Sequence, residues 1–256
     1  MSDDIDIRDS WNRIAAEYQR RNQIPTEYVH YGPHCPNEDQ LQLVGDVRGK
    51  RVLEIGCGGG QCAIAFAKRG AIATGIDLSD AQVEFARSLA ERERVQVTFL
   101  RGNIEDLSPL ADESQEVVFS AYGLGYVEHL DRCFAEVRRV LVPGGLFVFS
   151  GDHPFWHCLA EQSLTIACSY HDRSPDLWHW TYEEMGIRAP MRSFHRTVGD
   201  WFRALTSAGL EVLDIVEPEP VESGSGQDWG DYYSPERQRM VPATIIFKSR
   251  KPALHP

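Results

Sequence analysis

The sequence predicts an α/β fold in which a mostly parallel sheet carries helices on both faces. First, an apolar run at residues 52–55 ends at the turn Gly56-Cys57-Gly58-Gly59-Gly60, and an amphipathic segment at 61–69 follows. This order indicates a strand, a tight turn and a helix. Second, further apolar runs that each suit one buried strand occur at residues 71–76, 95–100, 116–120 and 146–150. Third, the hydrophobic content of 42% is enough to cover both faces of a parallel sheet.

Two helices are predicted before the first strand. Apolar side chains recur at i, i+3, i+4 and i+7 from Trp11 to Tyr18, which predicts an amphipathic helix over residues 8–22. Residues 38–44 predict a short helix that leads into the core.

The residue composition and the hydrophobic pattern change after the fifth predicted strand. Residues 151–195 hold five of the nine histidines and show no clean helix or strand period, so we expect an irregular insert that faces a substrate. Residues 197–208 predict a helix that stops at Gly209, and residues 210–216 and 243–248 predict the last two strands.

The glycine turn is the most informative motif. A strand, a glycine turn and a helix start present free backbone N–H groups against which a nucleotide-like cofactor can lie. The next predicted strand ends in Asp77, about 20 residues after Gly56, where a carboxylate can accept both ribose hydroxyls; capping of the following helix is the alternative. The dinucleotide pattern G-x-G-x-x-G would need glycine at position 61, which is Gln61. The spacing Glu54-x-Gly56-x-Gly58-x-Gly60 instead resembles motif I of the class I S-adenosylmethionine (SAM) methyltransferases.

The resemblance to this family extends over residues 51–150, with Gly102-Asn103-Ile104-Glu105-Asp106 after the third strand and Pro143-Gly144-Gly145 before the fifth. It implies a seven-stranded Rossmann-like sheet whose last strand is antiparallel, and SAM as cofactor with S-adenosyl-L-homocysteine (SAH) as product. It also implies four segments: a helical lid at 1–46, the SAM-binding core at 47–150, a substrate-facing insert at 151–196, and the completion of the sheet at 197–256.

Cofactor contacts follow from the same resemblance. The turn would bind the methionine part of SAM, Asp77 the ribose, and the residues after strands two and three the adenine. We assign no thiol chemistry to Cys57, a small residue in a turn. The implied set is Tyr18, Glu54, Gly56, Cys57, Gly58, Gln61, Asp77, Leu78, Gln82, Asn103, Ile104, Glu105 and Ser120.

Methyl transfer is an in-line displacement, so the protein must align the reactants, exclude water and, for some nucleophiles, remove a proton. His153 is the best-placed base because it follows the fifth strand directly, with loop capping as the open alternative; Tyr122 and Tyr31 complete the predicted catalytic group. Aromatic and histidine side chains in the irregular segments favour a planar or cationic small molecule. The predicted substrate contacts are Tyr28, Tyr126, Trp156, His179, Trp180 and His195.

Composition excludes several function classes. A net charge of −12, with no basic and aromatic cluster, argues against nucleic acid as partner. The N-terminus lacks an apolar signal region and no run approaches 18 apolar residues, so we expect a cytoplasmic protein without a membrane partner. We expect a monomer or a homodimer. The six cysteines form no C-x-x-C pair and are expected to be reduced thiols. We expect no metal, since residues 120–125 offer no hard ligand; a soft site at His153, His157 and Cys158 is the alternative.

These observations lead to a functional hypothesis. The chain is expected to be a SAM-dependent methyltransferase acting on nitrogen or oxygen of a small molecule, similar to enzymes of bacterial specialised metabolism and natural product biosynthesis. A SAM- or SAH-binding protein without catalysis is one alternative. An NAD-binding oxidoreductase is the other, and Gln61 and the Pro143-Gly144-Gly145 motif oppose it.

Overall fold

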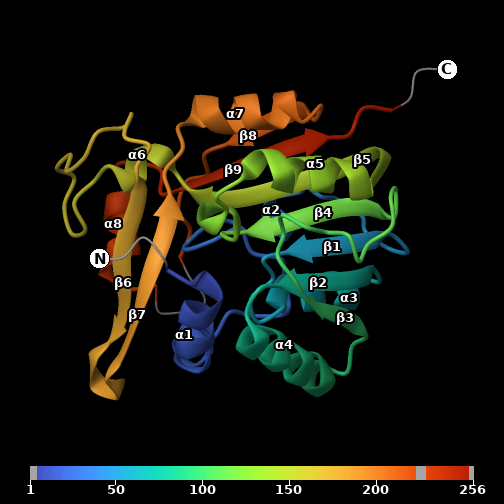
Figure 1. Ribbon diagram of the computed structural model, residues 1–256, viewed down its shortest axis with the longest axis horizontal. Helices are drawn as coiled ribbons and strands as arrows, with labels where there is room; N and C mark the ends of the chain where they lie inside the picture. Colours follow the sequence, from blue (N-terminus) through green and yellow to red (C-terminus); the bar gives the residue numbers. More distant parts are fainter. Residues whose placement is uncertain (1–4, 223–228, 254–256) are drawn as a thin grey trace.

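The computed structural model describes residues 5–222 and 229–253 (Figure 1). Residues 1–4 and 254–256, at the ends of the expected lid and sheet-completion segments, lie outside the described residues, as does part of the acidic N-terminus on which the signal-peptide expectation rests. The strands are β1 (Arg51–Ile55), β2 (Ile72–Asp77), β3 (Val97–Arg101), β4 (Gln115–Ala121), β5 (Leu141–Asp152), β6 (Pro175–Tyr182), β7 (Ile187–Phe194), β8 (Glu211–Val216) and β9 (Thr244–Arg250).

The α-helices are α1 (Ile7–Asn22), α2 (Glu38–Leu41), α3 (Gln61–Lys68), α4 (Asp80–Glu93), α5 (Leu130–Val140), α6 (Pro154–His157), α7 (Val198–Ser207) and α8 (Pro235–Gln238). Short 3₁₀ turns are η1 (Leu124–Tyr126), η2 (Glu183–Met185) and η3 (Asp231–Tyr233). The predicted helices begin and end within one residue of these bounds, except that α2 stops three residues early because Gln42 adopts a left-handed cap.

The main sheet has seven strands in the order β3-β2-β1-β4-β5-β9-β8. The pairings from β3 through β5 are parallel, whereas β9 lies between β5 and β8 and is antiparallel to both. The predicted seven-stranded, mostly parallel sheet with an antiparallel last strand is therefore confirmed. Because the parallel strands end at one edge, the loops that follow β1, β2, β4 and β5 meet there.

Alternating side chains cover both faces of the sheet. On β1, Val52 packs with α3 and the segment before it, whereas Leu53 packs with α5 and α7. The same alternation separates Val148 from Phe147 and Phe149 on β5. Strands apolar on both faces need helices on both faces, as the sequence indicated.

Strand β5 is longer than predicted. It begins at Leu141, and the Pro143-Gly144-Gly145 motif lies within it instead of introducing it. The pairing with β4 slips between Gln115↔Leu141 and Val117↔Leu146, so the motif forms a bulge, and Gly144 takes a left-handed φ of 81°. The sequence run at 146–150 is the regular part of this strand.

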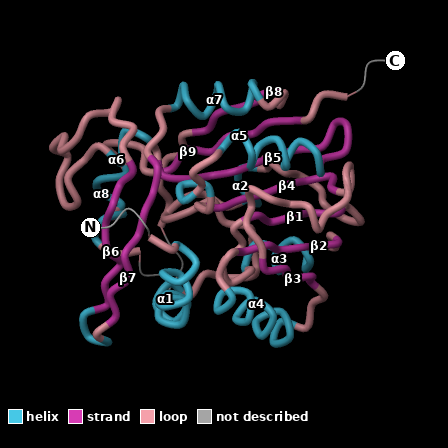
Figure 2. The backbone as a smooth tube through the Cα atoms, in the orientation of Figure 1, coloured by secondary structure: helices cyan, strands magenta, loops and turns pink. Residues whose placement is uncertain are grey.

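The expectation of an irregular insert at 151–195 was wrong for its second half. Strands β6 and β7 pair antiparallel in full register from Pro175↔Phe194 to Tyr182↔Ile187 and form a separate two-stranded sheet. In Figure 1 this hairpin lies at the left, beyond the ends of the parallel strands, and Figure 2 shows the long loop between α6 and β6 next to it. Alternating large and small residues at 178–182 were the signal for a strand.

Helix α1 lies between this hairpin and the main sheet (Figure 1). Asp6 caps it by accepting from the N–H groups of Arg8 and Asp9. Arg8 pairs with Asp80 at the start of α4, and Ser10 donates to the carbonyl of Pro190 on β7. Helix α1 therefore joins the Rossmann-like core to the hairpin.

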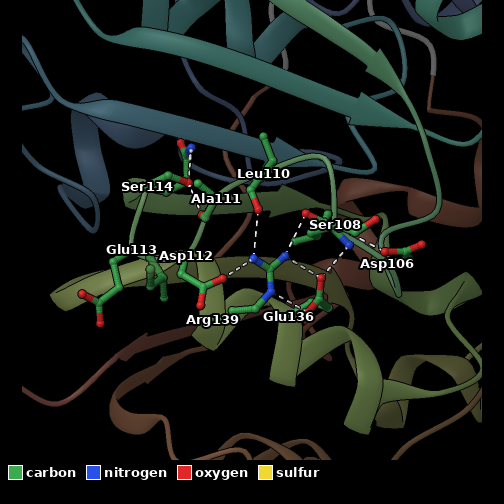
Figure 3. A network of polar contacts seen from close by, with 12 residues as sticks. Asp106, Ser108, Leu110, Ala111, Asp112, Glu113, Ser114, Glu136 and Arg139 are labelled. Atoms are coloured by element: carbon green, nitrogen blue, oxygen red, sulfur yellow. Dashed lines mark hydrogen bonds and ion pairs between the residues drawn. The ribbon is translucent and has the colours of Figure 1, made fainter.

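A second polar network fixes the loop after β3 (Figure 3). The guanidinium of Arg139 donates to the carbonyls of Leu107 and Leu110, at 2.8 and 2.9 Å, and also binds Asp112 and Glu136. Glu136 in turn accepts from the N–H of Leu107 at 2.8 Å. Since this loop begins with residues 103–105, the network on α5 holds part of the predicted cofactor site in place.

The structure also bears on membrane-spanning helices and on the cysteines. Among the described residues, no helix combines the length and the apolar character that crossing a bilayer requires. All six cysteines lie within the described ranges as free thiols, and only Cys168 is exposed.

We predict that Arg139→Met lowers the free energy of unfolding by about 2–3 kcal/mol, because two carbonyls and two carboxylates lose a charged donor. Chemical denaturation of both proteins measures this. Arg132→Met is the control: Arg132 is exposed on the same helix, and the change should cost no more than about 0.5 kcal/mol. Equal stability of the two variants would contradict a structural role for the network.

Candidate functional site

A cavity of about 1070 Å³ lies at the carboxyl ends of the parallel strands. Ligand sites for one small molecule are on the order of 300–1,000 Å³, so this cavity can hold two ligands. Seventeen of the predicted site residues line it: Tyr18, Glu54, Gly56, Cys57, Gly58, Gln61, Asp77, Leu78, Gln82, Asn103, Ile104, Glu105, Tyr122, Tyr126, His179, Trp180 and His195.

The glycine turn forms one wall of the cavity. Gly56, Gly58 and Gly60 adopt φ values of 63°, 49° and 76°, which side chains rarely tolerate. A Cβ on Gly60 would collide with the Phe99 ring at 2.6 Å, whereas a Cβ on Gly58 would meet no protein atom within 4 Å. Gly60 is thus required for packing, and Gly58 leaves bare backbone facing the cavity.

Asp77 holds this turn against β2. Its carboxylate accepts from the N–H of Gly58 at 2.8 Å and from the N–H of Ser79 at 2.9 Å. Burial raises the pKa of Asp77, although both backbone donors act in the opposite direction. Ser79, and not Asp77, is the residue that caps α4, so the capping alternative for Asp77 does not hold.

Glu54 lies behind the turn. It accepts from the N–H of Ala63 at 2.7 Å, at the start of α3. Burial, reinforced by the nearby Asp77 carboxylate, raises the pKa of Glu54 to about 8. The cofactor end of the cavity therefore contains two carboxyl groups in a poorly hydrated setting, which favours a ligand that carries positive charge.

Three glutamines attach α1 to the glycine turn. Gln61 donates to Gln19 at 2.6 Å, and Gln19 donates to Gln82 at 2.8 Å. The three side chains come from α3, α1 and α4, and all are buried. A Cβ on Gly59 would stand 2.5 Å from the Gln19 amide nitrogen, so α1 rests directly on the turn.

The opposite wall is aromatic. Trp11 and Tyr18 of α1 lie edge to face, 5.4 Å apart between ring centroids, and Trp180 of β6 is 5.6 Å from Trp11 and 5.4 Å from Tyr18. Tyr126 is 5.5 Å from Trp11. The sequence predicted three of these four rings as ligand contacts but treated Trp11 only as a helix residue.

Tyr122 occupies the end of β4. It has a left-handed φ of 61°, and its hydroxyl is 2.7 Å from that of Thr244 on β9. Its ring meets the Tyr233 ring edge to face at 6.3 Å. Burial raises the pKa of the Tyr122 hydroxyl well above its usual value, which makes it a poor base and a good neutral hydrogen-bonding wall.

His153 does not line the cavity in the described part of the chain, in contrast to its predicted position. Its Nδ1 accepts from the N–H of Phe155 as the cap of α6, and its Nε2 lies 2.7 Å from Glu217. Burial lowers the pKa of this imidazole. Its neighbour Asp152 points into the cavity instead, because successive side chains on a strand point to opposite faces.

Tyr31 also lies elsewhere than predicted. It is fully buried against Phe119, and its hydroxyl donates to Glu38 at 2.5 Å. Glu38 further accepts from the N–H groups of residues 43–45, so the pair holds the segment before β1 together. Its neighbours His30 and Gly32 do line the cavity.

Three further predicted contacts lie off the cavity. Trp156 is buried between Tyr232, Tyr233 and the guanidinium of Arg237. Ser120 is buried beneath the glycine turn. Tyr28 is outside the lining as well.

Histidines line the far side of the cavity. His195 stacks on His157 with centroids 4.7 Å apart, and its Nε2 is 2.9 Å from the carbonyl of Tyr170. Burial lowers the pKa of His195. His129 also lines the cavity, at the N-terminal cap position of α5. No group of three or more possible metal ligands occurs among the described residues.

Residues 53–149 match a family model described as a methyltransferase domain. A ubiquinone biosynthesis O-methyltransferase from Alkalilimnicola ehrlichii is 37% identical over 113 residues, which are 43% of this chain and 44% of that protein. The matched region thus spans less than half the length of the ubiquinone biosynthesis O-methyltransferases with which this chain aligns.

Two solved structures show the same fold over most of the chain. An S-adenosylmethionine-dependent methyltransferase from Mesorhizobium loti has a TM-score of 0.61 at 24% identity and covers 83% of this chain and 95% of its own. The [4+2]-cyclase SpnF has a TM-score of 0.63 at 21% identity and covers 96% of this chain and 95% of its own. Identities this low indicate a common fold and nothing about the reaction.

We predict that His153→Ala lowers the free energy of unfolding by about 1–2 kcal/mol, because it removes the cap of α6 and the contact with Glu217. SAH affinity, measured by calorimetry, should not change. His171→Ala, at an exposed position, is the matched control and should leave stability within about 0.5 kcal/mol. A variant as stable as the wild type, or one with reduced SAH affinity, would restore the case for His153 at the ligand.

Proposed function

We propose that the chain belongs to the class I SAM-dependent methyltransferases and transfers the methyl group of SAM to nitrogen or oxygen of a small molecule, which the match of residues 53–149 to a methyltransferase domain supports. One observation carries the proposal. The glycine turn, with Asp77 beneath it, and the aromatic wall from Trp11 to Trp180 line a single cavity with volume for two ligands. A cofactor and a second molecule can therefore lie against each other.

The residues at the turn fit the cofactor. Gly58 leaves backbone open to the cavity, Asp77 keeps lone pairs free beyond its two backbone bonds, and Leu78 and Ile104 offer apolar surface for a planar base. Glu54, whose pKa burial raises to about 8, would become a carboxylate beside a positively charged ligand. When bound, SAM would supply an electrophilic methyl group on a sulfonium.

The remainder of the cavity would hold the acceptor. Rings from α1, η1 and β6 present flat apolar surfaces, and Tyr122 and Tyr126 place hydroxyl-bearing rings at the end of β4. Such walls align a planar molecule and keep water out, which are the two tasks that an in-line displacement requires. Natural product biosynthesis in the cytoplasm is the setting that we propose for it.

Two observations bear on the acceptor atom. The relatives from ubiquinone biosynthesis are named as O-methyltransferases, which supports oxygen, whereas the aromatic wall suits a cation as well as a neutral ring. The cavity thus suits an acceptor that presents either oxygen or nitrogen to the methyl group.

A second candidate is a SAM- or SAH-binding protein that transfers no methyl group. This candidate is supported by the similar fold of a [4+2]-cyclase, because a shared fold does not fix the reaction. Calorimetry with SAH and with NADH tests cofactor choice. Transfer of radiolabelled methyl from SAM to a panel of aromatic amines and phenols tests catalysis.

Asp77→Ala should weaken SAH binding by about 1–3 kcal/mol, through loss of charge-assisted bonds to the ribose and a looser turn. Calorimetry measures the affinity, and circular dichroism checks that the variant is folded. Asp214→Ala, an exposed carboxylate on β8 outside the cavity lining, should bind SAH as the wild type does. Unchanged affinity in folded Asp77→Ala would remove the cofactor assignment at this turn.

The lid should respond to the cofactor. We expect residues 8–34 to exchange amide hydrogens faster in the free protein than in its SAH complex, since α1 must leave the turn to admit a ligand. Helix α5, on the other side of the sheet, serves as the internal control and should not change. Identical exchange across 8–34 in both states would rule out a lid.

A further inference from the structure

Asp152 is a cavity carboxylate that the proposed function leaves unassigned. It is the last residue of β5, pairs with Thr244 of β9, and lines the cavity one strand away from Tyr122 on β4. In the register of β4 and β5, Ser150 pairs with Ala121, so Asp152 lies two residues beyond the end of β4. Its carboxylate is exposed and therefore accessible to a ligand in the cavity.

The surroundings of Asp152 are hydroxyls and rings. Tyr233 donates to its Oδ1 at 2.6 Å, and this is the one hydrogen bond that the described residues show for the carboxylate. The titratable groups that face it come from β4, η1, η3 and α6: Tyr122, Tyr126, Tyr232, Tyr233 and His157. None of these five carries a permanent positive charge.

The two arginines of the cavity lining have other partners. Arg192 lies 3.3 Å from Glu128 and over the Phe194 ring. Arg196 donates to the carbonyls of Val127 and Glu128 and packs over Phe194 and Trp201. Asp152 therefore faces the cavity without an arginine or lysine among the described residues to neutralise it.

A second polar group of β5 also lines the cavity. Ser150, two residues earlier on the same strand, is fully buried and lines the cavity, and its hydroxyl has no hydrogen-bond partner among the described residues. Buried hydroxyls are rarely left in this state. Together with Asp152 it offers one acceptor of charge and one hydroxyl on the same face of β5.

We propose that Asp152 binds a protonated amine of the acceptor, so that the substrate class is an aromatic or aryl-alkyl amine. This inference rests on the proposed function and narrows it to nitrogen. A carboxylate provides the counter-charge, and the rings of Tyr122, Tyr126 and Tyr233 provide faces and edges that favour a cation over a neutral group.

The same contact can free the nucleophile. One N–H bond of the ammonium breaks, its proton forms an O–H bond with the Asp152 carboxylate, and the electron pair stays on nitrogen as the neutral amine. Burial, opposed by the Tyr233 hydrogen bond and by His157, raises the pKa of Asp152 to about 6. The difference between this pKa and that of the protonated amine is therefore smaller than for an ordinary carboxyl group. A poorly hydrated cavity lowers the pKa of the amine and narrows it further.

Tryptamine and its alcohol analogue tryptophol are suitable probes, since they differ only in the charged group. With the protein saturated with SAH, tryptamine should bind about 10- to 100-fold more tightly than tryptophol at pH 7.5. Asp152→Asn should abolish this preference and leave SAH affinity unchanged. Asp214→Asn carries the same charge change on β8 outside the cavity lining and should retain the preference.

The wild-type protein provides a test that needs no variant. Below its pKa of about 6, Asp152 is neutral and attracts no cation, so tryptamine affinity should fall as the pH is lowered through this value. Tryptophol affinity should stay level over the same range. In Asp152→Asn the pH dependence should disappear; a dependence that persists would belong to another group and would contradict the role of Asp152.

Three results would overturn the inference: no preference for tryptamine, a preference that survives in Asp152→Asn, or a pH dependence that survives there. Failure of SAH to bind would instead overturn the proposed function, and this inference with it. The two failures are therefore distinguishable in a single series of titrations.

Discussion

The two hydrogen bonds that Asp77 accepts hold the site together, because they fasten a turn that has almost no side chains of its own. One bond reaches Gly58 in the turn and the other reaches Ser79 at the start of α4. They couple the ends of β1 and β2, so the backbone facing the cavity is fixed before any ligand arrives. The left-handed glycines make this approach possible, and Phe99 beneath Gly60 allows no side chain there.

Helix α1 extends this rigid corner to the acceptor side. The amide of Gln19 rests on the turn, while Trp11 and Tyr18 of the same helix belong to the aromatic wall. Trp180 on the hairpin completes that wall. Any displacement of α1 therefore changes both ends of the cavity at once. Coupling between the two ligands would come from shared contacts with a single helix and needs no longer path through the protein.

The sequence predicted the core well because its signals are local: an apolar run, a glycine turn, and Asp77 at a strand end. The predictions failed where the position of a side chain depends on which face of a strand it occupies or on its contacts in the folded protein. His153 and Asp152 are adjacent, but strand alternation places only Asp152 in the cavity. Tyr31 was predicted as a member of the catalytic group, whereas its hydroxyl donates to Glu38, seven residues later, in the core. The hairpin β6–β7 was missed because histidines and prolines hid its alternation.

The raised pKa of Glu54 affects the enthalpy that is measured when a ligand binds. Near neutral pH, Glu54 holds a proton in the free protein for most of the time, since its pKa is about 8. A cation placed beside it favours the carboxylate and expels that proton into the buffer. The measured enthalpy then includes the heat with which the buffer takes up the proton. Titrations in phosphate and in Tris would differ, and their difference counts the protons released.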